Sequence, residues 1–250
     1  DKLTYSVLMV MDPATGRVLS ATMHRTVIRS VMRFTYDEAQ QRIDSGRGKY
    51  AKLLREMRAL SELMYERRRE AGSIDFESRE YRFRFDEQGL PIEAYQKERL
   101  GTMRMIEDFM LAANRAVAEF IDRKAIQDNE RPFLYRIHAE PDPAKVRDVA
   151  QLARSLGYRL QAENPTPKTI QQFLDQVKGK PEEQLLNQLM LRAMAKAVYS
   201  EHNVGHFGLA FMHYTHFTSP IRRYPDLIVH RMLAEYQQPG GMPRAREHRY

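Results

Sequence analysis

Cysteine and tryptophan are both absent from the 250 residues of this chain. Without cysteine the chain can form no disulfide, cannot use a thiol as a nucleophile and cannot bind zinc through thiolates. No apolar run approaches the roughly 18 residues that a membrane-spanning helix needs, so we expect no membrane association. The lack of cysteine also fits a cytoplasmic protein, and we expect that location.

Closely spaced aspartates are missing as well, because the sequence contains no Asp-Asp and no Asp-x-Asp. Hard divalent cations prefer clustered carboxylate oxygens as ligands. The acidic neighbours that do occur, such as Glu140 with Asp142 and Glu182 with Glu183, fall in turns and helix starts. The sequence therefore predicts no metal-binding residues within this chain.

The composition is that of a globular protein, with 42% hydrophobic and 29% charged residues. If the chain folds as one globule, its exposed surface should be about 11,500 Å², which buries ~70% of the unfolded surface in a single core. The formal net charge of +7 favours a polyanionic partner, although only mildly.

The first half of the chain alternates strand-like and helix-like patterns. Two pairs of strand-like runs are each joined by a turn and predict two β-hairpins: residues 5–11 with 17–28, and residues 81–85 with 91–95. Three stretches with apolar residues at helical spacing predict helices: residues 35–43, 49–71 and 102–124. Alternating aromatic and basic side chains predict that the strand at 81–85 is half-buried.

The second half is predicted to be mostly helical. Proline and glycine residues near the helix ends indicate four helices: residues 143–156, 167–178, 181–202 and 220–236. Residues 205–219 are rich in glycine, histidine and aromatic side chains and predict a strand plus a loop. Because strands come early and helices late, the fold class is predicted as α+β, with residues 237–250 as a linker or truncated end.

The densest functional signal surrounds two neighbouring arginines, Arg222 and Arg223. Ser219 and Pro220 have the pattern of an N-cap and a first helical residue, which would leave backbone N–H groups unpaired near Ile221 and Arg222. Two arginines are poorly placed beside the positive end of a helix unless an anion binds there. The pattern therefore predicts a phosphate-binding site in which both arginines contact the substrate. The alternative is an ordinary helix start with both arginines in solvent.

Three histidines raise the question of a metal site. His206, His213 and His216 have the spacing His-x6-His-x2-His, and catalytic zinc does take three protein ligands. No carboxylate stands nearby in the sequence to orient them, so packing or hydrogen bonding is the favoured interpretation. A histidine-metal enzyme stays open as the weaker alternative.

Phe76 and a pair of carboxylates are further candidates. Phe76 is an isolated aromatic residue in a polar loop, where it could stack on a nucleic-acid base or instead pack into the core. Glu107 and Asp108 interrupt an apolar helix pattern, and adjacent helical residues do not share a face. We therefore expect one of the two carboxylates to face a cleft and the other to face solvent.

Several segments resemble one known family. Residues 213–227, HYTHFTSPIRRYPDL, resemble the signature of the RNB catalytic domain of the ribonuclease II / ribonuclease R family. Residues 205–210 resemble the segment that leads into this signature, more closely in the ribonuclease R branch. Residues 73–83 and 106–114 are similar to earlier segments of the domain. In this order the resemblance covers residues 1–236.

The resemblance implies a function and a role for each candidate residue. It implies processive 3′→5′ hydrolysis of single-stranded RNA to nucleoside 5′-monophosphates, with Mg²⁺ as cofactor. Arg222 would be the catalytic contact to the phosphates at the scissile end. Phe76 would be one jaw of an aromatic clamp that stacks the last bases, and Glu107 would contact the terminal nucleotide.

The sequence departs from this family in one respect. The family holds Mg²⁺ with an aspartate-rich motif near the start of its catalytic domain, and Asp1 aligns after that motif. We therefore expect residues 1–236 to be a partial RNB domain, inactive by itself, whose Mg²⁺ ligands lie upstream of Asp1. The alternative is a non-catalytic RNA-binding or scaffold protein that lacks the motif, and the coding DNA upstream of Asp1 would discriminate the two.

Overall fold

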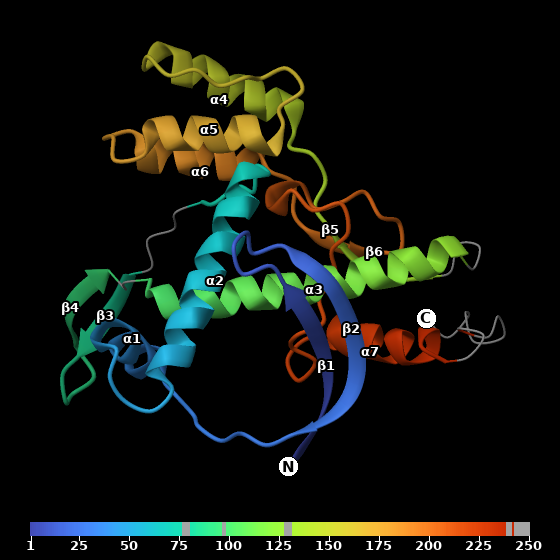
Figure 1. Ribbon diagram of the computed structural model, residues 1–250. Coiled ribbons are helices and arrows are strands. Elements are labelled where there is room, and N and C mark those ends of the chain that lie inside the picture. Colours follow the sequence, from blue (N-terminus) through green and yellow to red (C-terminus); the bar gives the residue numbers. More distant parts are fainter. Residues whose placement is uncertain (77–80, 97–98, 128–131, 239–241, 243–250) are drawn as a thin grey trace.

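The structure is a computed structural model that describes residues 1–76, 81–96, 99–127, 132–238 and 242 (Figure 1). Its α+β architecture confirms the prediction. The first half contains β1 (Lys2–Met11), β2 (Val18–Ile28), α1 (Tyr36–Ser45), α2 (Ala51–Glu70), β3 (Tyr81–Phe85), β4 (Pro91–Gln96) and α3 (Gly101–Gln127). The second half contains β5 (Tyr135–Ile137), α4 (Pro143–Ser155), α5 (Pro167–Val177), α6 (Glu183–Ala193), β6 (Val198–Ser200), the 3₁₀ helix η1 (Phe207–Leu209) and α7 (Tyr224–Tyr236). No helix in these described ranges is long and apolar enough to cross a bilayer.

β1 and β2 form the predicted antiparallel hairpin, with Val7 opposite Met23. Its turn is closed by the Asp12 carboxylate, which accepts a hydrogen bond from the Ala14 N–H at 2.9 Å. Gly16 adopts the left-handed conformation that this turn requires, with φ of 63°. The curved hairpin lies beside α3 and α7 (Figure 1), and it contributes Met23 to the buried core there.

α2 crosses α3, and a buried ion pair joins the two helices (Figure 1). Arg68 Nη1 lies 2.7 Å from Asp108 Oδ1, and the Ser61 hydroxyl donates to Asp108 Oδ2 at 2.8 Å. The Asp108 side chain is 0% exposed. Burial raises the pKa of Asp108, while Arg68 and Ser61 lower it. α2 ends at Glu70, within one residue of the predicted end, and Gly72 follows in the left-handed conformation, with φ of 99°.

The buried residues divide into three clusters, which differs from the single core we expected. The largest joins α3, α7, the β1–β2 hairpin and β5, and includes Val117, Ile121 and Leu233. The second lies among α4, α5 and α6, and the third lies between α1, α2 and α3. The exposed surface is 16,416 Å², well above the about 11,500 Å² of a single globule.

Some predictions about local structure are wrong, and one of them is the strand expected within residues 205–219, where the structure has η1 and isolated bridges of His206 instead. Tyr81, Phe83 and Phe85 are each more than half exposed, so β3 is not half-buried: it pairs only with β4, in a hairpin that carries no buried residue. The helix predicted over residues 181–202 ends at Ala193, and residues 198–200 pair with β5 instead. Valine and tyrosine favour strands, and pairing with β5 overrides the helical pattern there.

The predicted tail falls mostly outside the described residues. Residues 239–241 and 243–250 are not described, so the prediction of a linker or truncated end stays a prediction for them. Met242 is described and is 1% exposed, in the same core cluster as α7.

Candidate nucleic-acid interface

The signature segment is held against α3 by one asparagine. Asn114 Nδ2 donates to the Tyr214 hydroxyl at 3.1 Å, and Asn114 Oδ1 accepts the backbone N–H groups of Phe217 and Thr218 at 2.9 and 3.2 Å. Asn114 is buried. Sequence reasoning did not single out this residue, although it ends the stretch 106–114 that carried part of the resemblance. A polar side chain after two alanines, within an apolar helix, was the available signal.

The predicted helix start at Ser219 is wrong, because α7 begins at Tyr224. The Ser219 carbonyl accepts hydrogen bonds from the Arg222 and Arg223 N–H groups in a turn before the helix. Pro225 lies in the first turn of α7, where proline fits because its missing N–H needs no partner. The two arginines therefore precede the helix, and the predicted anion site at its first turn is not formed in that way.

A buried carboxylate of the chain itself neutralises Arg223. Asp226 Oδ2 accepts hydrogen bonds from Arg223 Nη2 at 2.8 Å and from the Ser219 N–H at 2.7 Å. The Asp226 side chain is 0% exposed. Asp226 thus takes the place of the external anion that the sequence predicted beside Arg223. Sequence reasoning missed it, although an acidic residue in the first turn of a helix is a recognisable pattern.

Three buried polar atoms of this segment have no hydrogen-bond partner among the described residues. They are Thr218 Oγ1, Arg223 Nε and Asp226 Oδ1. A buried unpaired polar group costs on the order of 1–3 kcal/mol, so native structures contain few of them. Arg222 is exposed next to them, and its guanidinium forms no ion pair with the described part of the chain. The segment therefore offers a hydroxyl and two arginines to a polar ligand.

Further positive charge surrounds this segment. The Arg136 guanidinium lies 4.6 Å from the centre of the Tyr199 ring, and the Tyr199 hydroxyl is hydrogen-bonded to His216 Nδ1 at 2.7 Å. Burial lowers the pKa of His216 to about 4, with a further decrease from the nearby Arg223. His216 is therefore neutral at pH 7, and the arginines carry the local charge.

The three histidines do not converge on one point. His206 packs against His138 and Tyr214, whereas His216 bonds to Tyr199. His213 Nδ1 contacts Asn203, at 2.9 Å. Within the ranges that the structure describes, no group of three His, Asp or Glu side chains is placed to hold a metal ion. The described residues therefore do not fit a bound Mg²⁺ or Zn²⁺.

The Phe76 loop lies at the other end of the candidate site. Phe76 is partly buried and packs against the core of α4, α5 and α6, which supports the packing interpretation, whereas stacking on a base stays a prediction. The Asp75 N–H donates to Gln171 Oε1 at 2.8 Å, and the Ile74 N–H donates to the Gly208 carbonyl at 2.8 Å. These bonds fix the loop between α5 and the segment that leads into the signature. Residues 77–80, which follow, lie outside the described residues.

Arg99 links the Phe76 loop to Glu107. Its guanidinium forms an ion pair with the Glu107 carboxylate and lies 3.7 Å from Asp75 Oδ1. Of the two adjacent carboxylates, Glu107 is the partly exposed one, whereas Asp108 is buried and faces a cavity. The prediction that one of them faces a cleft is therefore correct.

α3 connects the two halves of the candidate site. The structure joins Asp75, the neighbour of Phe76, to Glu107 through Arg99, and it places Arg222 and Arg223 in one turn of the signature segment. Glu107 and Asn114 are seven residues apart, which is two helical turns and about 10 Å along one face. The two halves therefore lie along one side of α3, without direct contact between their predicted residues in the described part of the chain.

Comparisons with known proteins agree on one family. The model of the RNB domain matches residues 1–239. Ribonuclease R of Aquifex aeolicus is 44% identical over 240 residues, which are 93% of this chain and 33% of that protein. Mycoplasma genitalium RNase R in complex with ribose methylated single-stranded RNA matches with a TM-score of 0.84 and 27% identity, over 99% of this chain and 39% of that one.

The fold is also similar to that of a protein described as a pseudonuclease. Yeast Ssd1, a pseudonuclease, matches with a TM-score of 0.68 at 20% identity, over 92% of this chain and 28% of that one. That likeness concerns the fold alone. The chain spans about a third of the length of the curated ribonuclease R that it matches. From the family model over almost all of its length and from this identity, we conclude that the chain belongs to the RNB domain family.

Proposed function

We propose that this chain is the RNA-contacting part of a processive 3′→5′ exoribonuclease that hydrolyses single-stranded RNA to nucleoside 5′-monophosphates. The observation that carries the proposal is the Thr218–Arg223 turn, where a buried hydroxyl and a buried guanidinium nitrogen are unpaired beside the exposed Arg222. Arginine forks match phosphate oxygens in geometry and charge. The ribonuclease R relatives support the activity, and the RNA-bound Mycoplasma relative supports the ligand.

Each candidate residue has a role that its surroundings favour. Arg222 is the catalytic contact, since its exposed guanidinium can reach phosphates at the scissile end. Asp226 orients Arg223, which presents its unpaired Nε to the same strand. Phe76 is supported on one side by the α4–α6 core, and it offers the rest of its ring for stacking on a base. Arg99 fixes the Glu107 carboxylate, which contacts the terminal nucleotide.

Mg²⁺ would activate the attacking water and stabilise the leaving oxygen in such a hydrolysis. The described residues provide no ligand set for it. We therefore propose that this chain holds and orients the RNA, while the carboxylates for the metal come from residues upstream of Asp1 in the intact protein.

A second candidate is a non-catalytic RNA-binding protein. It is favoured by the lack of a carboxylate cluster in the described residues. Both candidates predict RNA binding by this chain, and they differ only in whether the intact protein hydrolyses it.

The test compares this chain with a version extended upstream of Asp1 in the gene. Both are incubated with single-stranded RNA and millimolar Mg²⁺, and mononucleotide release is followed by chromatography. We expect release from the extended protein only, and weak, salt-sensitive RNA binding by this chain. Release by this chain itself would contradict the assignment of metal ligands to upstream residues. No release by either protein, with RNA binding intact, would favour the non-catalytic alternative.

A further inference from the structure

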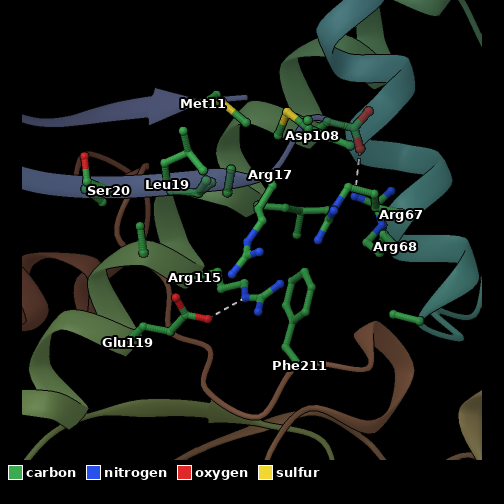
Figure 2. A pocket seen from close by; sticks show the side chains of 18 of the residues that line it. Met11, Arg17, Leu19, Ser20, Arg67, Arg68, Asp108, Arg115, Glu119 and Phe211 are labelled. Atoms are coloured by element: carbon green, nitrogen blue, oxygen red, sulfur yellow. Dashed lines mark hydrogen bonds and ion pairs between the residues drawn. The ribbon is translucent and has the colours of Figure 1, made fainter. Parts of the chain in front are cut away.

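A second basic site lies on a different side of α3. A cavity of about 490 Å³ is enclosed by the turn end of the β1–β2 hairpin, the second half of α2, the middle of α3 and Phe211 (Figure 2). Five arginines and two carboxylates line it: Arg17, Arg67, Arg68, Arg115, Arg123, Asp108 and Glu119. No residue of the Thr218–Asp226 segment lines it, and neither Phe76 nor Glu107 does.

The positive charges of this cavity are only partly neutralised. Two of its five arginines are paired with its two carboxylates, Arg68 with Asp108 and Arg115 with Glu119, each at 2.7 Å. The other three, Arg17, Arg67 and Arg123, form no ion pair with any residue that the structure describes. Hydrogen bonds from the Ala14 N–H and the Thr15 hydroxyl lower the pKa of Asp12, with a further contribution from Arg67, and they engage the Asp12 carboxylate in its own turn. Among the described residues that line the cavity, three positive charges therefore remain without an opposite charge.

The arginines are held in directions that suit a shared anion. The Arg115 guanidinium lies 4.9 Å from the centre of the Phe211 ring and is bonded to Glu119 through Nε. Figure 2 shows the side chains of Arg17 and Arg115 directed into the same space, with Arg67 and Arg68 on the adjoining wall. Arg68 is fixed by the buried Asp108. Guanidinium groups gathered in this way repel one another unless an anion lies between them, and their forks match phosphate oxygens.

We propose that this cavity binds the phosphate group of a nucleotide. Arg17, Arg67 and Arg115 donate to the phosphate oxygens, while Arg68 and Asp108 form the rigid wall behind them. The volume falls in the range of about 300–1,000 Å³ that small-molecule sites occupy. The phosphate can belong to a free nucleoside monophosphate or to the backbone of an RNA strand, and both present the same oxygens. The site is separate from the contacts of the proposed function and does not rest on them.

Calorimetric titration of this chain with four probes tests the proposal. The probes are AMP, adenosine, inorganic phosphate and a short oligoadenylate without terminal phosphates. We expect AMP and inorganic phosphate to bind and adenosine not to bind, with affinity falling as salt rises. Binding of the oligoadenylate but not of AMP or phosphate would support the proposed site and identify the RNA backbone, not a free nucleotide, as the source of the bound phosphate.

Matched variants assign the binding to this cavity. Arg17→Gln with Arg67→Gln should lower the affinity for the phosphate probe that binds by at least about 10-fold. Arg147→Gln with Arg154→Gln removes the same charge from exposed positions on α4, and should change the affinity for that probe by less than about twofold. Arg115→Lys keeps the charge but loses the fork, so it should weaken binding about 3- to 10-fold even if the double variant folds poorly.

Two outcomes would overturn the proposal. One is equal weakening by the cavity and α4 double variants, which would indicate a general charge effect. The other is the absence of binding by every phosphate-bearing probe. Arg222→Lys, measured beside the cavity variants, separates this site from the proposed RNA contact: AMP affinity that falls with Arg222→Lys but not with the cavity variants would place AMP at the signature segment and overturn this proposal.

Discussion

Around the Phe76 loop the charged side chains pair with one another, whereas the signature segment keeps polar atoms unpaired. Arg99 joins Glu107 and Asp75 at the partly exposed surface of the first region. In the second region the buried Asp226 holds Arg223 and the Ser219 N–H, and it still has an unpaired oxygen. The first region is balanced without a ligand, and the second is not.

Because of this difference, substitutions in the two regions should affect stability and RNA binding to different extents. Exposed ion pairs contribute little to folding because water and salt screen them. A buried carboxylate with a buried partner is different, because removing either one leaves an unpaired charge in the core. We therefore expect the signature segment to respond strongly to substitution in both stability and RNA binding, and the Phe76 region to respond mainly in binding.

The largest effect should come from removing the buried carboxylate. Asp226→Ala should lower the free energy of unfolding by about 3–5 kcal/mol, since Arg223 loses its partner in a buried site. Glu107→Ala, which breaks the partly exposed pair with Arg99, should lower it by less than about 1 kcal/mol. Urea unfolding of both variants measures the difference. Equal losses would show that the two regions are not distinct in this way, and Asp226→Asn provides a milder change if Asp226→Ala does not fold.

Acid should weaken the region around the signature segment. Burial lowers the pKa of His206 to about 3 and of His216 to about 4, both below the 6.5 of the unfolded chain. At a pH between the folded and the unfolded pKa, the unfolded state binds more protons than the folded state. The two histidines therefore stabilise the fold fully above about pH 6.5, and this contribution is lost as the pH decreases. At pH 5 each histidine should account for about 1–2 kcal/mol.

Urea unfolding at pH 7 and pH 5 measures this loss. Replacing His216 with Asn should reduce the loss between the two pH values. Replacing the exposed His202 with Asn should leave it unchanged. An equal loss in all three proteins would contradict the role of burial at His216.

Phe76 should show an intermediate effect on folding. Phe76→Ala should lower the free energy of unfolding by about 1–2 kcal/mol, because the ring is partly buried against the α4–α6 core. Phe83→Ala removes a ring that is 56% exposed on β3, and should change stability by less than about 0.5 kcal/mol. Phe76→Ala should also weaken binding of short 3′ RNA ends. Unaltered RNA affinity would remove Phe76 from the interface and leave it as a packing residue.

The smallest effect on folding should come from Arg222. Arg222→Lys keeps the charge but loses the fork, so the affinity of this chain for single-stranded RNA should fall about 10-fold, or about 1.4 kcal/mol. In the upstream-extended protein, kcat/KM should fall by a similar factor. The melting temperature should not change, because the side chain is exposed. Wild-type affinity in the lysine variant would exclude Arg222 as a phosphate contact.

Much of the architecture was predictable from local patterns. The capping box at Thr35 and Glu38 and the N-cap at Asp142 begin helices where the sequence predicted them, since a side chain there bonds to nearby backbone. The β1–β2 hairpin also follows from its turn and its strand-forming residues. The start of α7 did not follow, because Ser219-Pro220 and Arg223-Tyr224-Pro225 are both acceptable helix starts.

The candidate site also combines features that the sequence predicted with contacts that only the folded structure shows. The sequence by itself determined the family, through the signature at residues 213–227, and the residue types that contact RNA in the proposal. Only the tertiary structure decided that Asp226 neutralises Arg223, that Asn114 holds the signature segment on α3, and that five arginines from three segments surround one cavity. The physical reason is range: a cap or a turn is set by residues a few positions apart, whereas these contacts depend on packing of whole helices.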